Sequence, residues 1–415
     1  MKHIGVIGAG ISGLTAAYLL GRRHRVTLYE RDSRLGGHTN TVTVDDEAGP
    51  LPLDTGFLVH NPATYPNLVR LFTELGVETR TSDMSFSVSC AATGLEYSSR
   101  GLRGFFADRR NRVRAAHYRL LADIIRFNRE APPLVEQPEA AEMTIGEFLR
   151  ARRYGEDFVT RYLTPMASAI WSSSLDGIER FPAQMLIRFL DNHGMLAVSR
   201  RPTWRVVAGG SQAYVQRMAA RLGGVRLGAR LASVRRSERA VVLGFHDRPA
   251  ETVDEVVFSC HGDQVLPLLT DATDAERDVF AHFTTTPNET WLHADARMLP
   301  RLPKARASWN YRLGASPECP PSVTYDLNRL QRLSAATQYC VTLNPREPIA
   351  RDRVIGRFAY RHPRFTVAAM RAQGRWSDVS GVGRTHFCGA YWRNGFHEDG
   401  VVSAVRVARA LGVSW

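Results

Sequence analysis

The chain has 415 residues, more than one compact core usually holds at ~100 to 200 residues per domain, so we expect two or three domains. Hydrophobic residues make up 44% of it and charged residues 23%, and its five scattered cysteines form no CxxC pair or Cys/His cluster, which argues against a disulfide scaffold or a metal site. Basic residues number 54 against 41 acidic ones, a net charge of +13, and only Lys2 and Lys304 are lysines. This guanidinium charge reflects either a GC-rich genome or a surface that binds anionic oxygens.

The longest uncharged run, residues 4–21, has the length of a signal peptide or a membrane span. It contains five glycines, and no small-residue cleavage site follows it. We therefore expect a cytoplasmic protein without a transmembrane helix.

The same run carries a dinucleotide-binding pattern. A β-type segment at residues 2–7 is followed by Gly-x-Gly-x-x-Gly and then by a helical segment at 14–20. In this arrangement the first glycine makes the tight turn, the second admits the pyrophosphate and the third lets helix and strand pack closely, while the helix N-terminus offers free amides to the phosphates. The residues expected at the phosphates are Gly8, Gly10, Ile11, Ser12 and Gly13.

A second predicted strand, residues 25–29, ends in Glu30, whose carboxylate suits ribose hydroxyls. The continuation, Glu30-x-x-x-Arg34-x-Gly36-Gly37, resembles the extended FAD signature of the flavin-containing amine oxidoreductase superfamily, which includes monoamine oxidases, phytoene desaturases and protoporphyrinogen oxidase. Alternatively, the two glycines form a plain turn. The FAD contacts implied by the resemblance in this part are Glu30, Arg31, Arg34, Gly36, Gly37, His38, Thr39, Gly56 and Phe57.

Later segments extend the resemblance. A strand at 204–208, a Gly-Gly pair and a helix at 212–222 match the family's middle FAD segment, and in the next strand, 225–234, Leu231 is either a backbone contact of the adenine or a core leucine. The last helix, predicted at 401–411, would point its N-terminus at the flavin pyrimidine. The implied contacts there are Gly389, His397, Glu398, Asp399 and Val401. The two carboxylates equally suit helix capping, and His397 is the candidate catalytic acid or base.

The predicted architecture is α/β: a Rossmann-type, GR2-like FAD-binding domain of the amine oxidase fold, with an interleaved α+β substrate domain. We assign residues 1–79, 203–268 and 376–415 to the FAD-binding domain, and 80–202 and 269–375 to the substrate domain. No second dinucleotide fingerprint occurs, so we expect the substrate to reduce the flavin, and oxygen, a quinone or a protein acceptor to reoxidise it.

The sequence departs from the family's amine oxidases at three positions. Their active-site lysine has no counterpart except Lys304, in a loop-like context, and Phe396 falls where they carry a tyrosine of the aromatic cage. Cys388 lies too near the last helix to match the cysteine that attaches flavin covalently in monoamine oxidases, so we expect non-covalent FAD.

The chain more closely resembles a bacterial subgroup of predicted FAD-binding proteins, through the motifs at residues 36–41, 54–57, 82–87 and 395–400. Members are commonly encoded beside cyclopropane-fatty-acid-synthase-like methyltransferases, which implies an acyl-lipid substrate and a methyltransferase partner. The expected function is a desaturase or dehydrogenase that transfers hydride from an unsaturated or methylated acyl chain of a membrane phospholipid to flavin N5. Amine oxidation, flavin-assisted isomerisation of a lipid double bond and non-catalytic lipid binding remain alternatives.

Four aromatic residues are candidates for the substrate cavity, although aromatic residues also commonly form cores. They are Trp309, Tyr311, Tyr325 and Phe396.

The stretch from Arg100 to Arg129 holds nine arginines and two aspartates, a local net charge of 9 − 2 = +7. Val113, Leu120 and Phe127 follow helical spacing in it. This predicts a basic amphipathic helix, which either docks on an anionic membrane as a peripheral contact or forms the solvated face of a core helix. The sequence offers no recognition motif for nucleic acid.

Overall fold

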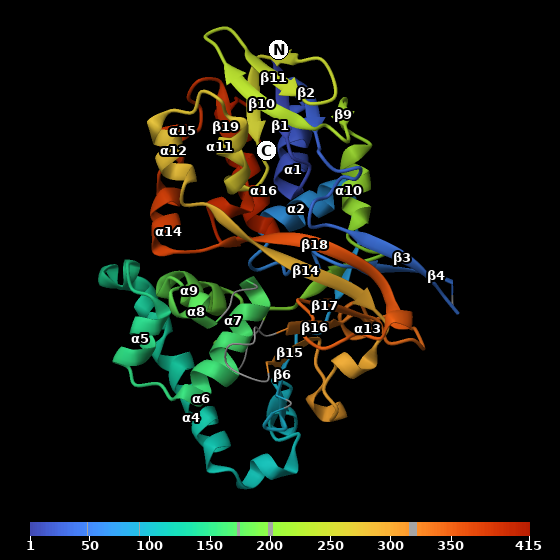
Figure 1. Cartoon of the computed structure of the whole chain (residues 1–415), viewed down its shortest axis with the longest axis vertical. Helices are drawn as coiled ribbons and strands as arrows, with labels where there is room; N and C mark the ends of the chain where they lie inside the picture. Colours follow the sequence, from blue (N-terminus) through green and yellow to red (C-terminus); the bar gives the residue numbers. More distant parts are fainter. Residues whose placement is uncertain (48, 91, 172–174, 198–201, 315–321) are drawn as a thin grey trace.

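The computed structural model describes residues 1–415 except 48, 91, 172–174, 198–201 and 315–321. The molecule is elongated, with a parallel sheet near one end, a long, mostly antiparallel sheet across the middle and a group of helices at the other end (Figure 1).

The parallel sheet has five strands, in the order β19-β13-β1-β2-β9, and every neighbouring pair is parallel. Its strands are β1 (His3–Ile7), β2 (Arg25–Tyr29), β9 (Val225–Arg226), β13 (Glu255–Phe258) and β19 (Thr385–Phe387). The central strands are almost wholly buried because helices cover the sheet, as a parallel sheet requires. Strands from the beginning, middle and end of the chain therefore form a single Rossmann-type sheet.

Four helices pack beside this sheet and on one another: α1 (Ile11–Leu20), α2 (Pro66–Leu75), α10 (Gln212–Ala219) and α16 (His397–Ala410). Helices α1 and α16 lie against each other at their N-terminal ends. A Cβ at Gly400 would come within 2.7 Å of the Ile11 side chain, so only glycine permits this approach. The N-termini of the two helices are thereby brought to the same place.

The second sheet has seven strands in the order β18-β14-β17-β16-β15-β6-β7. They are β6 (Phe86–Cys90), β7 (Leu95–Ser98), β14 (Thr284–His293), β15 (Trp309–Leu313), β16 (Ser322–Asp326), β17 (Cys340–Leu343) and β18 (Val354–Arg364). All neighbours are antiparallel except β15 and β6. Strands β14 and β18 form the long ribbon across the middle of Figure 1.

The helices beyond this sheet bury a core of their own around Phe127, Phe148 and Phe158. They are α3 (Gly101–Phe105), α4 (Ala115–Glu130), α5 (Ile145–Ala151), α6 (Glu156–Phe158), α7 (Thr164–Trp171), α8 (Leu175–Glu179) and α9 (Ala183–Asn192).

The remaining elements connect these parts. The strands are β3 (Thr41–Asp46), β4 (Gly49–Asp54), β5 (Thr79–Thr81), β8 (Arg205–Val207), β10 (Leu231–Arg236), β11 (Val241–Phe245) and β12 (Glu251–Val253). The helices are α11 (Val265–Leu268), α12 (Asp274–Phe280), α13 (Leu327–Leu330), α14 (Val367–Gly374) and α15 (Trp376–Val379).

Two predicted elements differ from the structure by more than the position of their ends. The strand expected at 225–234 is two strands in different sheets, because Gly228 has a left-handed φ of 61° and turns the chain between β9 and β10. The helix expected between Arg100 and Arg129 is three pieces: α3, the 3₁₀ turn Arg109–Val113 and α4. Two residues of the predicted apolar stripe face inward on α4, since Leu120 is 3% exposed and Phe127 is fully buried. Val113, which the same spacing placed with them, is instead 86% exposed at the end of the 3₁₀ turn.

Within the described part of the chain, no helix combines the length and the apolar character needed to cross a bilayer.

Candidate active site

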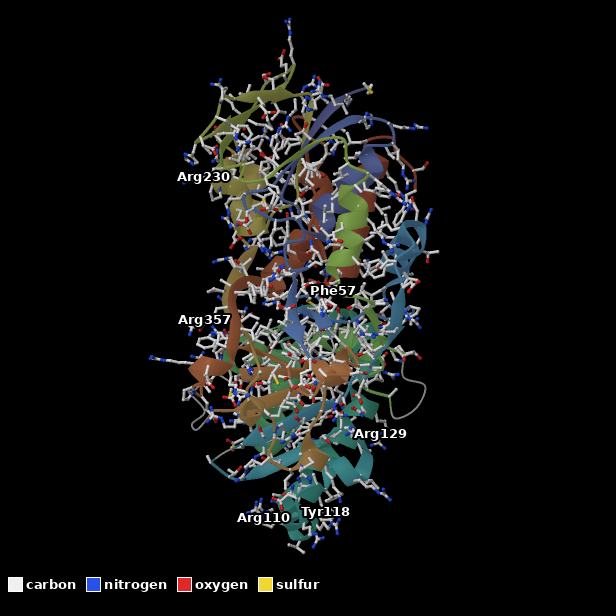
Figure 2. All side chains as sticks on the ribbon, turned by 90° about the vertical axis from the view of Figure 1, so that its right-hand side faces the viewer. Phe57, Arg110, Tyr118, Arg129, Arg230 and Arg357 are labelled. Carbon is white, nitrogen blue, oxygen red and sulfur yellow. The ribbon has the colours of Figure 1, made fainter. Side chains whose placement is uncertain are left out.

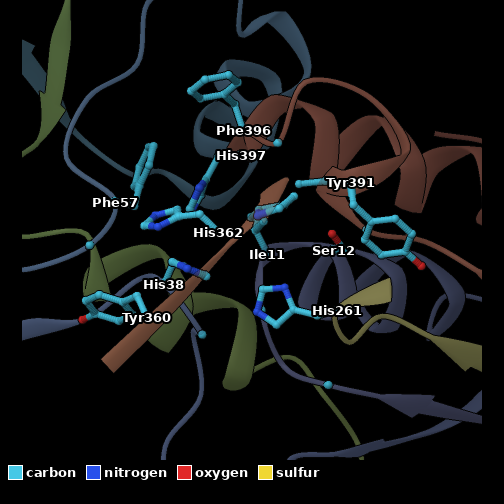
Figure 3. A pocket seen from close by; sticks show the side chains of 18 of the residues that line it. Ile11, Ser12, His38, Phe57, His261, Tyr360, His362, Tyr391, Phe396 and His397 are labelled. Atoms are coloured by element: carbon cyan, nitrogen blue, oxygen red, sulfur yellow. The ribbon is translucent and has the colours of Figure 1, made fainter. Parts of the chain in front are cut away.

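A cavity of about 600 Å³ lies between the parallel sheet and the seven-stranded sheet. Its wall is built from both sheets, from the N-termini of α1 and α16, and from α7 and α9. Figure 3 shows side chains from α1, α16 and β18 around a common space. The volume is within the range of cofactor and small-molecule sites.

One end of the cavity has the geometry of a phosphate site. Helix α1 has no side-chain N-cap, and Gly10, at its N-cap position, has nothing within 4 Å of where a Cβ would stand. By contrast, a Cβ at Gly13 would lie 1.8 Å from the Gly8 carbonyl oxygen. A dinucleotide-binding turn requires open space at the position of Gly10 and close packing at the position of Gly13. The uncapped amides of α1 face the space left for the phosphates.

Glu30 lies at the same end. Its Oε2 accepts a hydrogen bond from the Ala9 amide at 2.7 Å, and its Oε1 accepts one from Asp32 at 2.9 Å. The carboxylate is therefore fixed at the end of β2, where it lines the cavity beside Arg31. An acceptor at this point suits a ribose hydroxyl.

The Gly36–Gly37 turn closes over the glycine loop. Both glycines have positive φ, and a Cβ at Gly37 would stand 3.0 Å from the Gly10 Cα. Arg34 lies beneath this turn rather than in the wall, donating to the Gly37 carbonyl at 2.7 Å and to the Thr39 carbonyl at 3.0 Å. Its visible role is to hold the turn against the loop.

The N-terminus of α16 forms the part of the wall next to the start of α1. Gly395, Phe396 and His397 line the cavity, whereas Glu398 and Asp399 point away from it and cap helices. Glu398 accepts from the Asn67 and Leu68 amides at the start of α2, and Asp399 accepts from the Phe396 amide at 3.0 Å. The capping alternative for these two carboxylates therefore describes their contacts in the structure. Burial raises the pKa of Asp399 to about 6.

His397 is held by three contacts. Its ring stacks on Phe57, and its Nε2 lies 3.0 Å from the Thr39 hydroxyl and 3.1 Å from the Tyr214 hydroxyl. Burial, and then the nearby His60, lower the pKa of His397 to about 3. The imidazole is consequently neutral at physiological pH, in a fixed orientation at the cavity wall.

Three further histidines meet on the side of the cavity formed by β18. The His38 ring lies 5.7 Å from the His261 ring and 5.2 Å from the His362 ring, centroid to centroid, and His38 Nε2 is buried without a hydrogen-bond partner. Burial lowers the pKa of each, to about 4 for His362. Among the described residues no group of three His, Cys, Asp or Glu side chains is arranged to hold a metal. The unpartnered His38 nitrogen is a donor or acceptor left for a bound molecule.

The lining that residues 80–202 and 269–375 contribute to the cavity has no charged side chain. The lining residues from 80–202 and 269–375 are Met84, Ile170, Phe189, Met195, Trp309, Tyr325, Leu343, Tyr360, His362 and Pro363. Every charged lining residue that the structure describes lies instead in the first or the middle predicted FAD segment: Glu30, Arg31, Asp32 and Asp263. The cavity is thus divided into a polar end and an uncharged end.

The structure brings most of the predicted site residues to this wall. Those that line it are Gly8, Gly10, Ile11, Ser12, Glu30, Arg31, Gly36, Gly37, His38, Gly56, Phe57, Leu231, Trp309, Tyr325, Gly389, Phe396 and His397. Those that do not line it are Gly13, Arg34, Thr39, Tyr311, Glu398, Asp399 and Val401. Tyr311 is buried at 1% exposure on β15, beside the cavity but outside its lining.

Sequence reasoning missed His261, His362, Phe189 and Trp204 as lining residues. Tyr360 and His362 stand two residues apart on β18, so they share one face of the strand. The alternation along β18 could have predicted that these two side chains face the cavity. No pattern in the neighbouring sequence predicts that Phe189 on α9 or Trp204 lines it.

The cysteine thiols near the cavity are not activated. Cys260 lines it, and burial raises the pKa of its thiol to about 12; Cys388 is fully buried and outside the lining. Cys319 lies outside the described residues. Because the thiolate is the reactive form, protonated thiols fit a cofactor that is not attached through cysteine.

The fold and this divided cavity define a dinucleotide-binding flavoprotein. The family model described as flavin containing amine oxidoreductase matches residues 11–412, and the chain belongs to that family. It is accordingly an FAD-dependent oxidoreductase.

Individual curated relatives match only a short segment of the chain. An L-amino-acid oxidase of Bungarus fasciatus is 48% identical over 58 residues, and one of Notechis scutatus scutatus is 47% identical over the same length. Each match covers 12% of this chain and 11% of the relative, so this chain matches about a tenth of the length of those relatives.

Solved structures share the whole fold. A fatty acid isomerase from P. acnes that produces CLA superposes with a TM-score of 0.69 at 16% identity, covering 98% of each chain. Cyclohexylamine oxidase from Brevibacterium oxydans gives 0.68 at 15% identity, covering 99% of each chain. At such identity the likeness concerns the fold alone.

Proposed function

We propose that the protein is an FAD-dependent dehydrogenase of membrane acyl chains. It removes a hydride from an allylic carbon or from a carbon beside a branch, and the neighbouring carbon loses a proton to water, so that an additional double bond forms. The observation that carries this proposal is the uncharged half of the cavity. Its described lining from 80–202 and 269–375 contains aliphatic, thioether, aromatic and neutral imidazole side chains. Such a wall gains free energy by removing a hydrocarbon chain from water and offers nothing to pair with a charged substrate.

The same lining argues against amines and amino acids. An amino acid carboxylate would need a basic partner, yet Arg31, the one basic residue in the described lining, is at the dinucleotide end. Lys304 is exposed on a 3₁₀ turn away from the cavity, so it does not supply the lysine that the amine oxidases carry. Phe396 also offers no hydroxyl at the cage position.

The residues that fit FAD are the open Gly10 position, the uncapped start of α1 and the Glu30 carboxylate. FAD, when bound, accepts the hydride, and oxygen, a quinone or a protein acceptor takes the electrons from it. The chain's own contribution is to hold the acyl segment against an apolar wall, to exclude water and to aim the dipole of α16 at the reacting end of the cavity.

His397 serves in this proposal as a positioning residue. With a pKa of about 3, His397 is a weak proton acceptor, and its protonated form, which could donate a proton, is not populated at neutral pH. Its stacking on Phe57 and its contact with Thr39 instead fix the wall where α16 begins.

Double-bond isomerisation is the second candidate. The structure with the same fold from P. acnes is described as a fatty acid isomerase, which supports an acyl chain in a cavity of this kind. The resemblance to a subgroup encoded beside lipid methyltransferases supports the same substrate class, with such a methyltransferase as partner. An isomerase would move a double bond without consuming an electron acceptor.

Lipid profiling of cells with and without this gene tests the proposal. We expect an acyl species with one more double bond only when the gene is present, and its loss when the wild type is replaced by Gly10→Ala, which removes the cofactor's space. An isomer of unchanged hydrogen content would favour isomerisation, and an unchanged acyl profile would reject both lipid candidates.

A further inference from the structure

Hydrophobic side chains are exposed together at one end of the molecule. Of the eight large hydrophobic residues that are exposed in the described chain, four lie between residues 102 and 125. They are Leu102 at 69% exposure, Val113 at 86%, Tyr118 at 50% and Ile125 at 60%. They come from α3, the 3₁₀ turn Arg109–Val113 and α4, which we call the basic tip. Figure 2 places Arg110 and Tyr118 at this end of the long axis, with Arg129 further toward the middle.

The exposed residues of α4 form a stripe of their own. Tyr118, Ala122, Ile125 and Arg129 are all exposed, and their spacing of four, three and four residues puts them on one face of the helix. The opposite face, with Leu120 and Phe127, is packed into the helical core. The outward face of α4 therefore combines an aromatic, an aliphatic and a basic residue, which is unusual for a solvated surface.

Arginines surround these side chains and lack acidic partners. Those that are exposed and have no ion pair among the described residues are Arg100, Arg103, Arg109, Arg112, Arg119 and Arg129. The nearby acids are already occupied: Asp108 binds Arg110, Asp123 binds Arg126 and the Gly155 amide, and Glu130 accepts from Tyr154. The positive charge of the tip is consequently left for a partner.

We propose that the basic tip is a docking surface for an anionic lipid bilayer. Arginines around the rim would meet the lipid phosphates, and Leu102, Val113 and Ile125 would enter the interface between head groups and acyl chains. A bilayer fits because the surface is convex, terminal and both basic and apolar, a combination typical of interfacial anchors. Docking does not depend on which acyl bond is oxidised, although it would bring the proposed substrate to the enzyme.

The experiment is sedimentation of the FAD-loaded full chain with vesicles of phosphatidylcholine, with and without phosphatidylglycerol. Variant Arg103→Ser/Arg112→Ser/Arg119→Ser should bind anionic vesicles about a hundredfold more weakly at low salt, since each basic residue near the surface contributes about fivefold. The matched control is Arg230→Ser/Arg235→Ser/Arg239→Ser, which removes the same charge from exposed, unpaired arginines in or beside β10, at the Arg230 end (Figure 2). The control should bind like the wild type.

A second variant, Leu102→Ser/Val113→Ser/Ile125→Ser, keeps the charge and removes the apolar contact. It should bind more weakly than the wild type at high salt, where the arginine contribution is screened. Absorbance of the bound flavin checks that each variant is folded. Equal loss in the tip and control arginine variants, no binding of the wild type to anionic vesicles, or unchanged high-salt binding of the apolar variant would each overturn the proposal.

Because vesicle binding requires no catalysis, it is scored separately from the acyl-chain function. Vesicle binding without any change in acyl lipids would support the docking proposal and reject the proposed reaction. A change in acyl lipids without vesicle binding would support the reaction and reject the docking proposal. Binding of the tip to an acidic protein in place of vesicles would also overturn the docking proposal.

Discussion

The imidazole of His397 lies 3.7 Å from the ring of Phe57, centroid to centroid, with the two planes inclined by 17°. The pair joins the first turn of α16 to the chain segment after β4, and both rings line the cavity. Stacking at this distance, together with the Thr39 contact, fixes the imidazole, while burial removes its charge.

The ionisation of His397 gives the first prediction. Because its pKa is lowered to about 3, its ring should keep the nitrogen chemical shifts of a neutral imidazole down to about pH 5, where an ordinary histidine of pKa ~6.5 is protonated. Its NMR signal is assigned by its disappearance in His397→Gln. A titration midpoint near that of a free histidine would contradict the fixed, neutral imidazole.

The second prediction concerns the dinucleotide end. Gly10→Ala adds a methyl group where no protein atom lies within 4 Å, and Gly10 has an ordinary φ of −71°, so the fold should be unaffected. The methyl group would occupy space meant for the pyrophosphate, so FAD content should fall about tenfold or more. Bound flavin per protein and the melting temperature of the apoprotein are the measurements.

Gly374→Ala is the control for this variant, since it also has open space around its Cβ but lies at the end of α14. Wild-type FAD content in Gly10→Ala would show that the glycine loop does not hold the cofactor.

The third prediction concerns the uncharged wall. Met84→Asp places a carboxylate among apolar lining residues, and desolvating it against a hydrocarbon is costly, so acyl-lipid turnover should fall about tenfold or more. FAD content should be retained because Met84 is outside the glycine loop. Met143→Asp makes the same change away from the cavity and should leave turnover intact. Equal turnover in the two variants would place the substrate elsewhere.

The fourth prediction is acid lability of the apoprotein. Burial lowers to about 4 the pKa of four histidines: His60, His193, His293 and His362. Below a pH of about 6.5 the unfolded chain binds protons at these sites that the folded chain does not, so stability present above that pH is lost toward pH 4. Each site contributes at most about 1.4 kcal/mol per pH unit.

Two carboxyls act in the opposite direction. Burial raises the pKa of Asp54 and Asp399 to about 6, so the folded chain gains stability from their protonation as the pH falls. The histidines outnumber them, so the free energy of unfolding, measured with urea, should still be lower near about pH 5 than near about pH 7.5. Equal or greater stability in acid would show that these histidines are protonated in the fold.

The sequence predicted the dinucleotide end far better than the rest. Its geometry depends on local constraints, such as the 1.8 Å approach at Gly13 and the positive φ at Gly36 and Gly37, which only glycine satisfies. The apolar half depends instead on residues such as Phe189 and Leu343, brought together from a helix and a strand far apart in the chain, which no local pattern specifies.

In the basic tip, the sequence predicted the buried face of α4 but not its exposed face. Helical spacing correctly indicated that Leu120 and Phe127 share a face, but spacing cannot say whether an apolar face meets a core or a membrane. The tertiary packing used that face for the core. The exposed residues Tyr118 and Ile125 on the other face were visible only once α4 had been placed.

The most direct test of the acyl-chain function is anaerobic mixing of the FAD-loaded protein with unsaturated or methylated phospholipids, followed by the flavin absorbance. We expect at least one of these lipids to bleach the flavin and a polyamine to leave it unchanged. Bleaching by the polyamine with no response to any lipid would contradict it and identify an amine oxidase.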